Sequence, residues 1–110
     1  MIIKIDHKVH VLVNEFYAIS MTLHPSLSKE VVEQKVERLF EKIMSLKTYG
    51  RIYPRSRYKH DWIIAGYQEC VFEDFHFAFK IEKAIETGED VVHIVDACHS
   101  LLYYNPEDKK

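Results

Sequence analysis

The sequence predicts an α+β fold: an N-terminal strand, then an antiparallel helix hairpin packed on one face of a small, mostly antiparallel sheet that ends in a three-stranded meander. Two periodicities predict it. In the first half of the chain, apolar residues recur at three- and four-residue steps, which is typical of helices with one buried face. In the second half, residues 75–81 (FHFAFKI) alternate between two faces, which indicates a half-buried strand.

The first half begins with a short strand over residues 1–5, a segment that is apolar and largely β-branched. A helix follows from about Val9, and Asp6 is positioned to cap it. The helix ends at His24, because a residue before proline is displaced from helical geometry. Ser28 is the expected N-cap of a second helix, and the link of about four residues makes the two helices an antiparallel hairpin.

The second half begins with residues 47–65, which break both periods and are expected to form a long loop with one helical turn near Trp62. Loops of this length inside a compact domain are usually functional. Strands are then expected over residues 67–73, 75–81 and 91–99, with a turn around Thr87 and Gly88 between the last two.

Composition indicates one domain over residues 1–110, because this length is enough for a single core. Hydrophobic residues make up 47% and charged residues 29%, a balance that excludes a disordered chain. No apolar run approaches the roughly 18 residues of a membrane-spanning helix, and MIIKIDHK does not resemble a signal peptide, so a cytoplasmic protein is expected. Cys70 and Cys98 are expected to be reduced thiols.

Positive charge is concentrated in the segment RIYPRSRYKHDW, although the chain has a net charge of −2. Arg51, Arg55, Arg57 and Lys59 against Asp61 give this segment +4 − 1 = +3, which leaves −2 − 3 = −5 elsewhere. Cations alternating with aromatic rings hold single-stranded nucleic acid through phosphate contacts and base stacking. An acidic protein segment fits the same loop, and a solvated loop with its rings packed on the helices is the simpler alternative.

A polar sheet face is predicted next to this loop. If the last two strands pair around residue 86 or 87, Lys80 lies opposite His93. The side chains of His76, Lys80, His93 and His99 then project from one face, away from the helices. A merely solvated sheet face is the alternative reading.

No metal or cofactor is predicted, although the chain has seven histidines. His7 and His10 are three residues apart without a further ligand nearby, and no HExxH or CxxC motif is present. A cysteine nucleophile at Cys98 is disfavoured, because its neighbour His99 points to the opposite face of the strand.

Three segments in order carry a family resemblance: the basic, proline-containing YGRIYPRSRYK, then CVFEDFHFAFKIEK, and finally VVHIVDACHSLLYYN. The second segment contains the alternating strand 75–81, and the third closes on the histidine and serine of residues 95–100. Together they resemble the RelE/ParE superfamily of bacterial type II toxins over nearly the whole chain. The resemblance implies a RelE/ParE-like fold.

The resemblance also implies a toxin–antitoxin function of the plasmid-stabilisation kind. The RelE branch cuts mRNA on the ribosome as a metal-free endoribonuclease, and the ParE branch inhibits DNA gyrase. A cognate antitoxin protein neutralises both. The implied partners are therefore an antitoxin and mRNA on the ribosome, with DNA gyrase as the alternative target.

Residue roles follow from the same resemblance. His99 and Tyr103 are the expected acid and base, and Lys80, where the family usually has arginine, is expected to stabilise the reacting phosphate. Where many members carry arginines this chain has Gln68, Glu69 and Ser100, which favours the alternative of a non-catalytic module that binds gyrase or another protein. The residues expected to bind RNA phosphates are Arg51, Arg55, Arg57, Lys59, His76 and His93.

Overall fold

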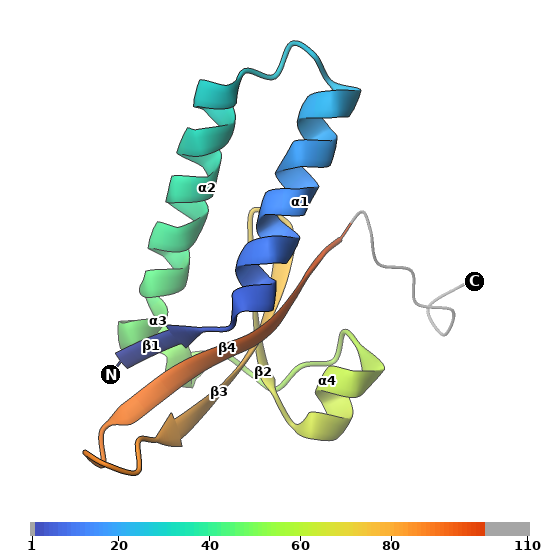
Figure 1. Ribbon diagram of the computed structural model, residues 1–110. Helices are drawn as coiled ribbons and strands as arrows, with labels where there is room; N and C mark the ends of the chain where they lie inside the picture. The colour runs from blue at the N-terminus through green and yellow to red at the C-terminus, as the bar shows by residue number, and fades with distance from the viewer. Residues whose placement is uncertain (1, 101–110) are drawn as a thin grey trace.

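A computed structural model describes residues 2–100 and has the expected α+β architecture, with two long helices on one side of a four-stranded mixed sheet (Figure 1). Apart from the short helices between α2 and β2, the order of elements is the one that the periodicities predict. The long helices are α1 (His7–Leu23) and α2 (Lys29–Met44), and the strands are β1 (Ile2–Ile5), β2 (Gln68–Phe72), β3 (Phe75–Lys83) and β4 (Asp90–His99).

The sheet has the strand order β1-β4-β3-β2. The last three strands form the predicted antiparallel meander, and β1 adds to β4 in parallel after the helical crossover. Lys80 lies opposite His93, as the sequence predicts. The register between β3 and β4 shifts at Ala78 and Phe79, because β4 carries one extra residue, Val95, at a β-bulge. Strands β1 and β2 are the two edges of the sheet.

The helix hairpin is bounded much as expected. Helix α1 ends at Leu23, and the side chain of Ser28 caps α2 by accepting a hydrogen bond from the Val31 N–H at 3.2 Å. Asp6 occupies the N-cap position of α1, but its side chain makes no capping bond. Its Oδ1 lies 2.7 Å from Nε2 of His93 instead, so the expected capping role of this carboxylate is wrong.

The main core lies between the hairpin and one face of the sheet. Each of its elements contributes side chains that have no exposed surface or almost none. The largest are Val9 and Val13 of α1, Leu39 and Ile43 of α2, and Phe75, Phe77, Phe79, Val92 and Ile94 of the sheet.

The segment before β2 is more regular than the predicted long loop. It contains α3 (Leu46–Tyr49), a 3₁₀ helix (Gly50–Ile52) and α4 (His60–Ala65). The chain turns away from α4 at Gly66, whose φ of 73° is the left-handed conformation that glycine adopts without strain.

Helix α4 lies on the sheet face opposite the hairpin (Figure 1). Trp62, which is 1% exposed, packs there on Ala78 and Val95 and donates a hydrogen bond from Nε1 to Oδ2 of Asp96 at 3.0 Å. The face that the sequence predicts to be open is therefore partly covered. Within residues 2–100, none of the helices combines the length and the apolar character that crossing a membrane requires.

Candidate functional site: a histidine held on the outer sheet face

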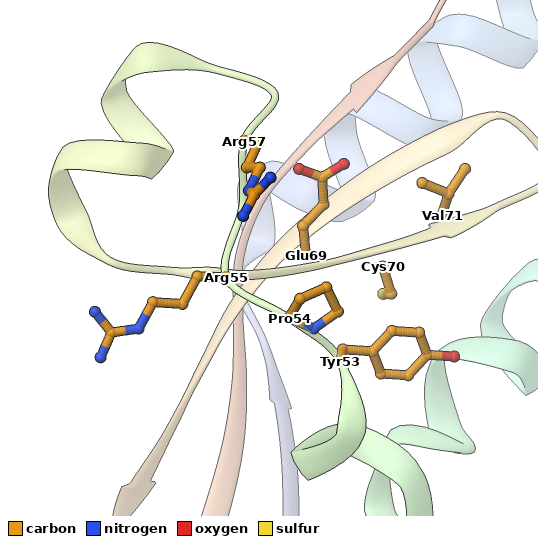
Figure 2. A pocket seen from close by; sticks show the side chains of 7 residues that line it. All are labelled: Tyr53, Pro54, Arg55, Arg57, Glu69, Cys70 and Val71. Atoms are coloured by element: carbon orange, nitrogen blue, oxygen red, sulfur yellow. The ribbon is translucent and has the colours of Figure 1, made fainter.

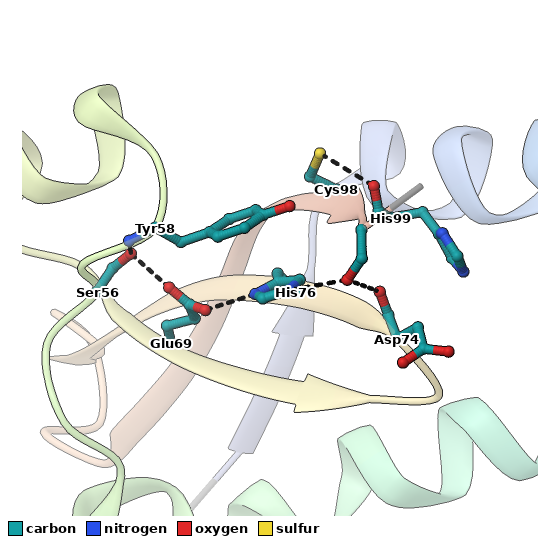
Figure 3. Close-up of polar contacts among 8 residues, drawn as sticks. Ser56, Tyr58, Glu69, Asp74, His76, Cys98 and His99 are labelled. Carbon is teal, nitrogen blue, oxygen red and sulfur yellow. Dashed lines mark hydrogen bonds and ion pairs between the residues drawn. The ribbon is translucent and has the colours of Figure 1, made fainter. Parts of the chain in front are cut away.

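His76 is the centre of a polar network on the outer sheet face (Figure 3). Its Nδ1 lies 2.6 Å from Oε2 of Glu69, and its Nε2 lies 3.0 Å from Oγ of Ser100. The ring of Tyr58 stacks on the imidazole with 3.7 Å between centroids and 4° between planes. We refer to Ser56, Glu69, His76 and Ser100 as the His76 network.

The β2–β3 hairpin positions the acid and the base. Its two-residue turn consists of Glu73 and Asp74, both with positive φ, and the resulting register places Ala78 opposite Glu69. His76 is two residues from Ala78 on β3, so it is the diagonal neighbour of Glu69 on the same face, within reach of long side chains. Ser100 follows β4 and is fixed by a hydrogen bond from its N–H to the Asp74 carbonyl at 3.0 Å.

Both oxygens of the Glu69 carboxylate are engaged. Oε2 faces His76, and Oε1 accepts a hydrogen bond from Oγ of Ser56 at 2.6 Å. Ser56 is buried, and its Oγ also accepts a hydrogen bond from the N–H of Tyr58 at 3.2 Å. The side chains of Glu69 and His76 are only 14% and 15% exposed. A carboxylate held in this way fixes the orientation of the imidazole.

The hydroxyl of Ser100 allows this histidine to change protonation without losing a contact. Its Oγ lies 2.9 Å from the carbonyl oxygen of Asp74 and 3.0 Å from Nε2 of His76, yet it carries one hydrogen. When that hydrogen points to Asp74, a protonated Nε2 donates to Ser100. When it points to His76, an unprotonated Nε2 accepts. The arrangement suits a group that takes up and releases a proton.

Two arginines lie beside the network. Arg55 and Arg57 are exposed, line a groove of about 600 Å³ together with Glu69, and form no ion pair with any residue in the described range 2–100 (Figure 2). Arg57 and Glu69 project to the same side of β2, whereas Arg55 points away (Figure 2). Lys59 lies over the ring of Trp62, with 5.5 Å between Nζ and the ring centroid.

The expectation that His99 shares this face is wrong. His99 pairs with Phe75 and stacks on Phe16 at 3.9 Å on the helix side of the sheet, where it is 7% exposed. Burial lowers its pKa below the usual 6.5. The even spacing from His93 predicts a common face, but the extra residue Val95 reverses the alternation between them. His99 is a core histidine.

The remaining predicted site residues lie apart from His76. Along β3, Lys80 is four residues from His76, roughly 13 Å at strand spacing, and Trp62 packs on the sheet between them. Lys80 pairs with Glu82 at 3.6 Å. Arg51 pairs with Asp90 at the end of the β3–β4 hairpin.

His93 is held by two carboxylates. Its Nε2 lies 2.7 Å from Asp6 and its Nδ1 lies 3.2 Å from Glu82, and its side chain is 13% exposed. The hydrogen bond from His93 lowers the pKa of Asp6. Of the predicted residues within the described range 2–100, His76, Arg55 and Arg57 lie together with Glu69. Tyr103 lies outside the described residues.

The sequence analysis did not predict that Glu69 and Ser100 contact His76, or that Ser56 contacts Glu69. A signal for one of them was available in the turn residues Glu73 and Asp74. A two-residue hairpin turn fixes the register of the strands on either side, and this register makes Glu69 the diagonal neighbour of His76. The contact of Ser56 depends on the path of an irregular loop, which no periodicity reveals.

Comparison of the chain with known protein families, curated proteins and solved structures finds no match. The fold and the site therefore define the class of protein: a small α+β protein with a carboxylate–histidine pair on the outer face of a mixed sheet. Among the residues described, no group of three or more histidine, cysteine, aspartate or glutamate side chains is arranged to hold a metal ion.

Proposed function

We propose that the protein is a RelE/ParE-type toxin that cleaves RNA without a metal ion, with His76 as its proton-transfer residue. One observation carries the proposal: His76 is held between Glu69 and the exposed Ser100, near Arg57, which has no ion pair among the described residues. The family assignment rests on the sequence motifs. The site differs from the one that the resemblance implies, because His76 takes the role expected of His99.

The residue types match the reaction. In metal-free RNA cleavage, a base removes the proton of a 2′-hydroxyl, whose oxygen then bonds to the adjacent phosphorus. The bond from phosphorus to the 5′-oxygen breaks, and that oxygen receives a proton, which leaves a 2′,3′-cyclic phosphate. His76 accepts the proton of the 2′-hydroxyl and returns a proton to the 5′-oxygen, and Ser100 is the exposed end of the network through which it does so. Glu69 stabilises the imidazolium that forms between these two steps. Arg57 neutralises the additional phosphate charge.

The proposed partners follow from the predicted phosphate-binding residues, of which Arg55 and Arg57 are arginines without an ion pair in the described part of the chain. For single-stranded RNA, two arginines give a slope of at most about 0.7 × 2 in magnitude when the logarithm of the affinity is plotted against the logarithm of the salt concentration. They therefore hold RNA weakly. We propose that the ribosome presents the mRNA and supplies the remaining affinity. A cognate antitoxin would neutralise the protein in the bacterial cytoplasm.

A second candidate is a non-catalytic interaction module, either a gyrase inhibitor or another protein binder. It is favoured by the completeness of the His76 network, in which both ring nitrogens have partners and Tyr58 covers one face of the ring. A polar network in which every group has a partner can serve to fix the structure without taking part in catalysis. Activity measurements separate the two candidates.

The test is inducible expression in a bacterial host, with growth and mRNA 5′ ends recorded for the wild type, His76→Gln and the control His60→Gln. His60 is exposed and begins the short helix α4. We expect growth arrest and new ribosome-dependent cuts with the wild type and the control, and neither with His76→Gln. Growth arrest with intact mRNA would favour the gyrase candidate. Normal growth without new cuts for the wild type would contradict the proposed nuclease activity.

A further inference from the structure

Strand β2 forms one edge of the sheet, and the preceding loop covers only its beginning. The N–H of Ser56 donates to the carbonyl of Tyr67 at 2.7 Å, and the N–H of Glu69 donates to the carbonyl of Pro54 at 3.1 Å. Beyond Pro54 the cover ends, because the preceding residue, Tyr53, packs on Phe72 and Phe79 under the sheet.

The uncovered part of the edge presents main-chain hydrogen-bonding groups. Along an antiparallel strand, the N–H and C=O of one residue point to one side and those of the next residue to the other. Because the N–H of Glu69 points outward, the N–H and C=O of Val71 point outward too. Within residues 2–100, neither of these two Val71 groups has a hydrogen-bond partner on that side. The Val71 side chain is itself 49% exposed. Edges of this kind readily pair with another chain.

A groove with positive charge adjoins this edge (Figure 2). Tyr53, Pro54 and Cys70 form its apolar part, and Arg55 and Arg57 lie at the end nearer the start of β2. Neither arginine has an acidic partner among the described residues. Glu69, the acidic residue of this groove, is already bonded to Ser56 and His76.

We infer that this edge binds an extended, acidic segment of a partner protein by strand addition at Val71. The covering segment 54–56 runs antiparallel to β2, as its bridge from Arg55 to Gln68 requires. A strand in line with it enters from the turn at Glu73 and ends at Pro54, so its C-terminal end faces the two arginines. Main-chain pairing supplies affinity, and carboxylates at that end supply selectivity.

A second copy of this chain does not fit the same edge through its own β2. Antiparallel pairing of two β2 strands about Val71 would place residue 73 of the second copy opposite Glu69. Pro54 already occupies that position. The occupant is therefore a different segment that ends, or leaves the sheet, at this point. This site goes beyond the proposed function, because it uses a strand edge instead of His76.

The test is selection of random seven-residue peptides, displayed with free C-termini, on the full-length wild-type protein, with counter-selection on Val71→Pro. Proline removes the outward N–H, and edge strands tolerate it. We expect enriched peptides with β-branched residues and a C-terminal acidic residue. Their affinity should fall at least tenfold for Val71→Pro and at least fivefold for Arg55→Ala/Arg57→Ala.

Val71→Thr, which keeps the N–H, should retain wild-type affinity, and thermal unfolding of each variant shows whether it is folded. His76→Gln should also retain it, which separates this inference from the proposed nuclease. Failure to enrich any peptide would overturn the inference. So would equal binding to Val71→Pro, equal binding to Arg55→Ala/Arg57→Ala, or selection of peptides without an acidic side chain near the C-terminus.

Discussion

His76 and His99 lie in different surroundings because they are on opposite faces of the sheet, on neighbouring strands. His76 lies between a carboxylate and a hydroxyl, both of which accept hydrogen bonds from an imidazolium. His99 lies between Phe16 and Phe75, and burial lowers its pKa. Residue type alone therefore could not show which histidine lies in a polar site and which lies in the core.

This difference gives a prediction for His99→Phe. Because the folded-state pKa of His99 lies below the unfolded value of 6.5, the unfolded chain binds more protons as the pH falls. The contribution of His99 to stability is full above pH 6.5 and declines as the pH drops toward the lowered pKa. Phenylalanine cannot titrate, so the stability of the variant relative to wild type should rise from pH 7.5 to pH 5. Urea unfolding at several pH values measures this, and parallel profiles would contradict a buried, neutral His99.

Asp6 gives a second residue-scale prediction. The hydrogen bond from His93 lowers the pKa of Asp6, so its contribution to stability is full above the unfolded value of 3.8 and is lost as the pH falls through the lowered value. Asp6→Asn should therefore destabilise the protein at pH 7, and the difference from wild type should shrink below pH 3.8. A thermal unfolding midpoint that differs equally at pH 7 and pH 3 would exclude this explanation.

At the scale of elements, α4 is held to the sheet by one side chain. Trp62 is almost fully buried against Ala78 and Val95, and its indole N–H binds Asp96. Ile63 and Ile64 of the same helix are exposed. The position of the helix, and with it the neighbouring loop that carries Tyr58, thus depends on this anchor.

Trp62→Ala should lower the free energy of unfolding by about 3–5 kcal/mol, as expected for truncation of a large buried ring. Trp62→Phe should cost less, since it removes mainly the hydrogen bond to Asp96 and part of the packing. Urea unfolding followed by circular dichroism measures both. A cost well below about 1 kcal/mol for the alanine variant would show that α4 is not anchored in this way.

The cap of α2 gives a second prediction at this scale. Ser28→Ala removes the hydrogen bond to the Val31 N–H and should destabilise the protein by about 1 kcal/mol. Ser26→Ala is the matched control, because Ser26 is exposed and precedes the helix. Equal unfolding free energies for the two variants would exclude a role for the cap.

Periodicity was sufficient to predict both long helices and the last three strands, because each of them buries one continuous face. The helical turn expected near Trp62 is α4, whereas α3 and the 3₁₀ helix were missed, since three or four residues are too few to establish a period. The face of His99 was missed because one bulged residue, Val95, reverses all side-chain directions beyond it. Contacts made by loops, such as the bond from Ser56 to Glu69, depend on tertiary packing and leave no local signal.

For the whole molecule, the structure reduces the number of cations available for the proposed contacts with RNA phosphates. Arg51 pairs with Asp90 and Lys80 pairs with Glu82, whereas Arg55 and Arg57 have no ion pair within the described part of the chain. The logarithm of the affinity for a short single-stranded RNA should therefore fall with the logarithm of salt concentration with a slope of about −1.4, corresponding to two phosphate contacts. Fluorescence anisotropy measures it. For Arg55→Ala/Arg57→Ala the slope should approach zero, and a steep slope in that variant would place the binding surface elsewhere.

The central claim is that His76 transfers protons during RNA cleavage. Single-turnover cleavage of mRNA on programmed ribosomes, with the product ends identified, tests it most directly for wild type, His76→Gln and His60→Gln. We expect 2′,3′-cyclic phosphate ends, a rate reduced by about 10² or more in His76→Gln, and an unchanged rate in His60→Gln. Cleavage by folded His76→Gln at the wild-type rate would contradict the claim.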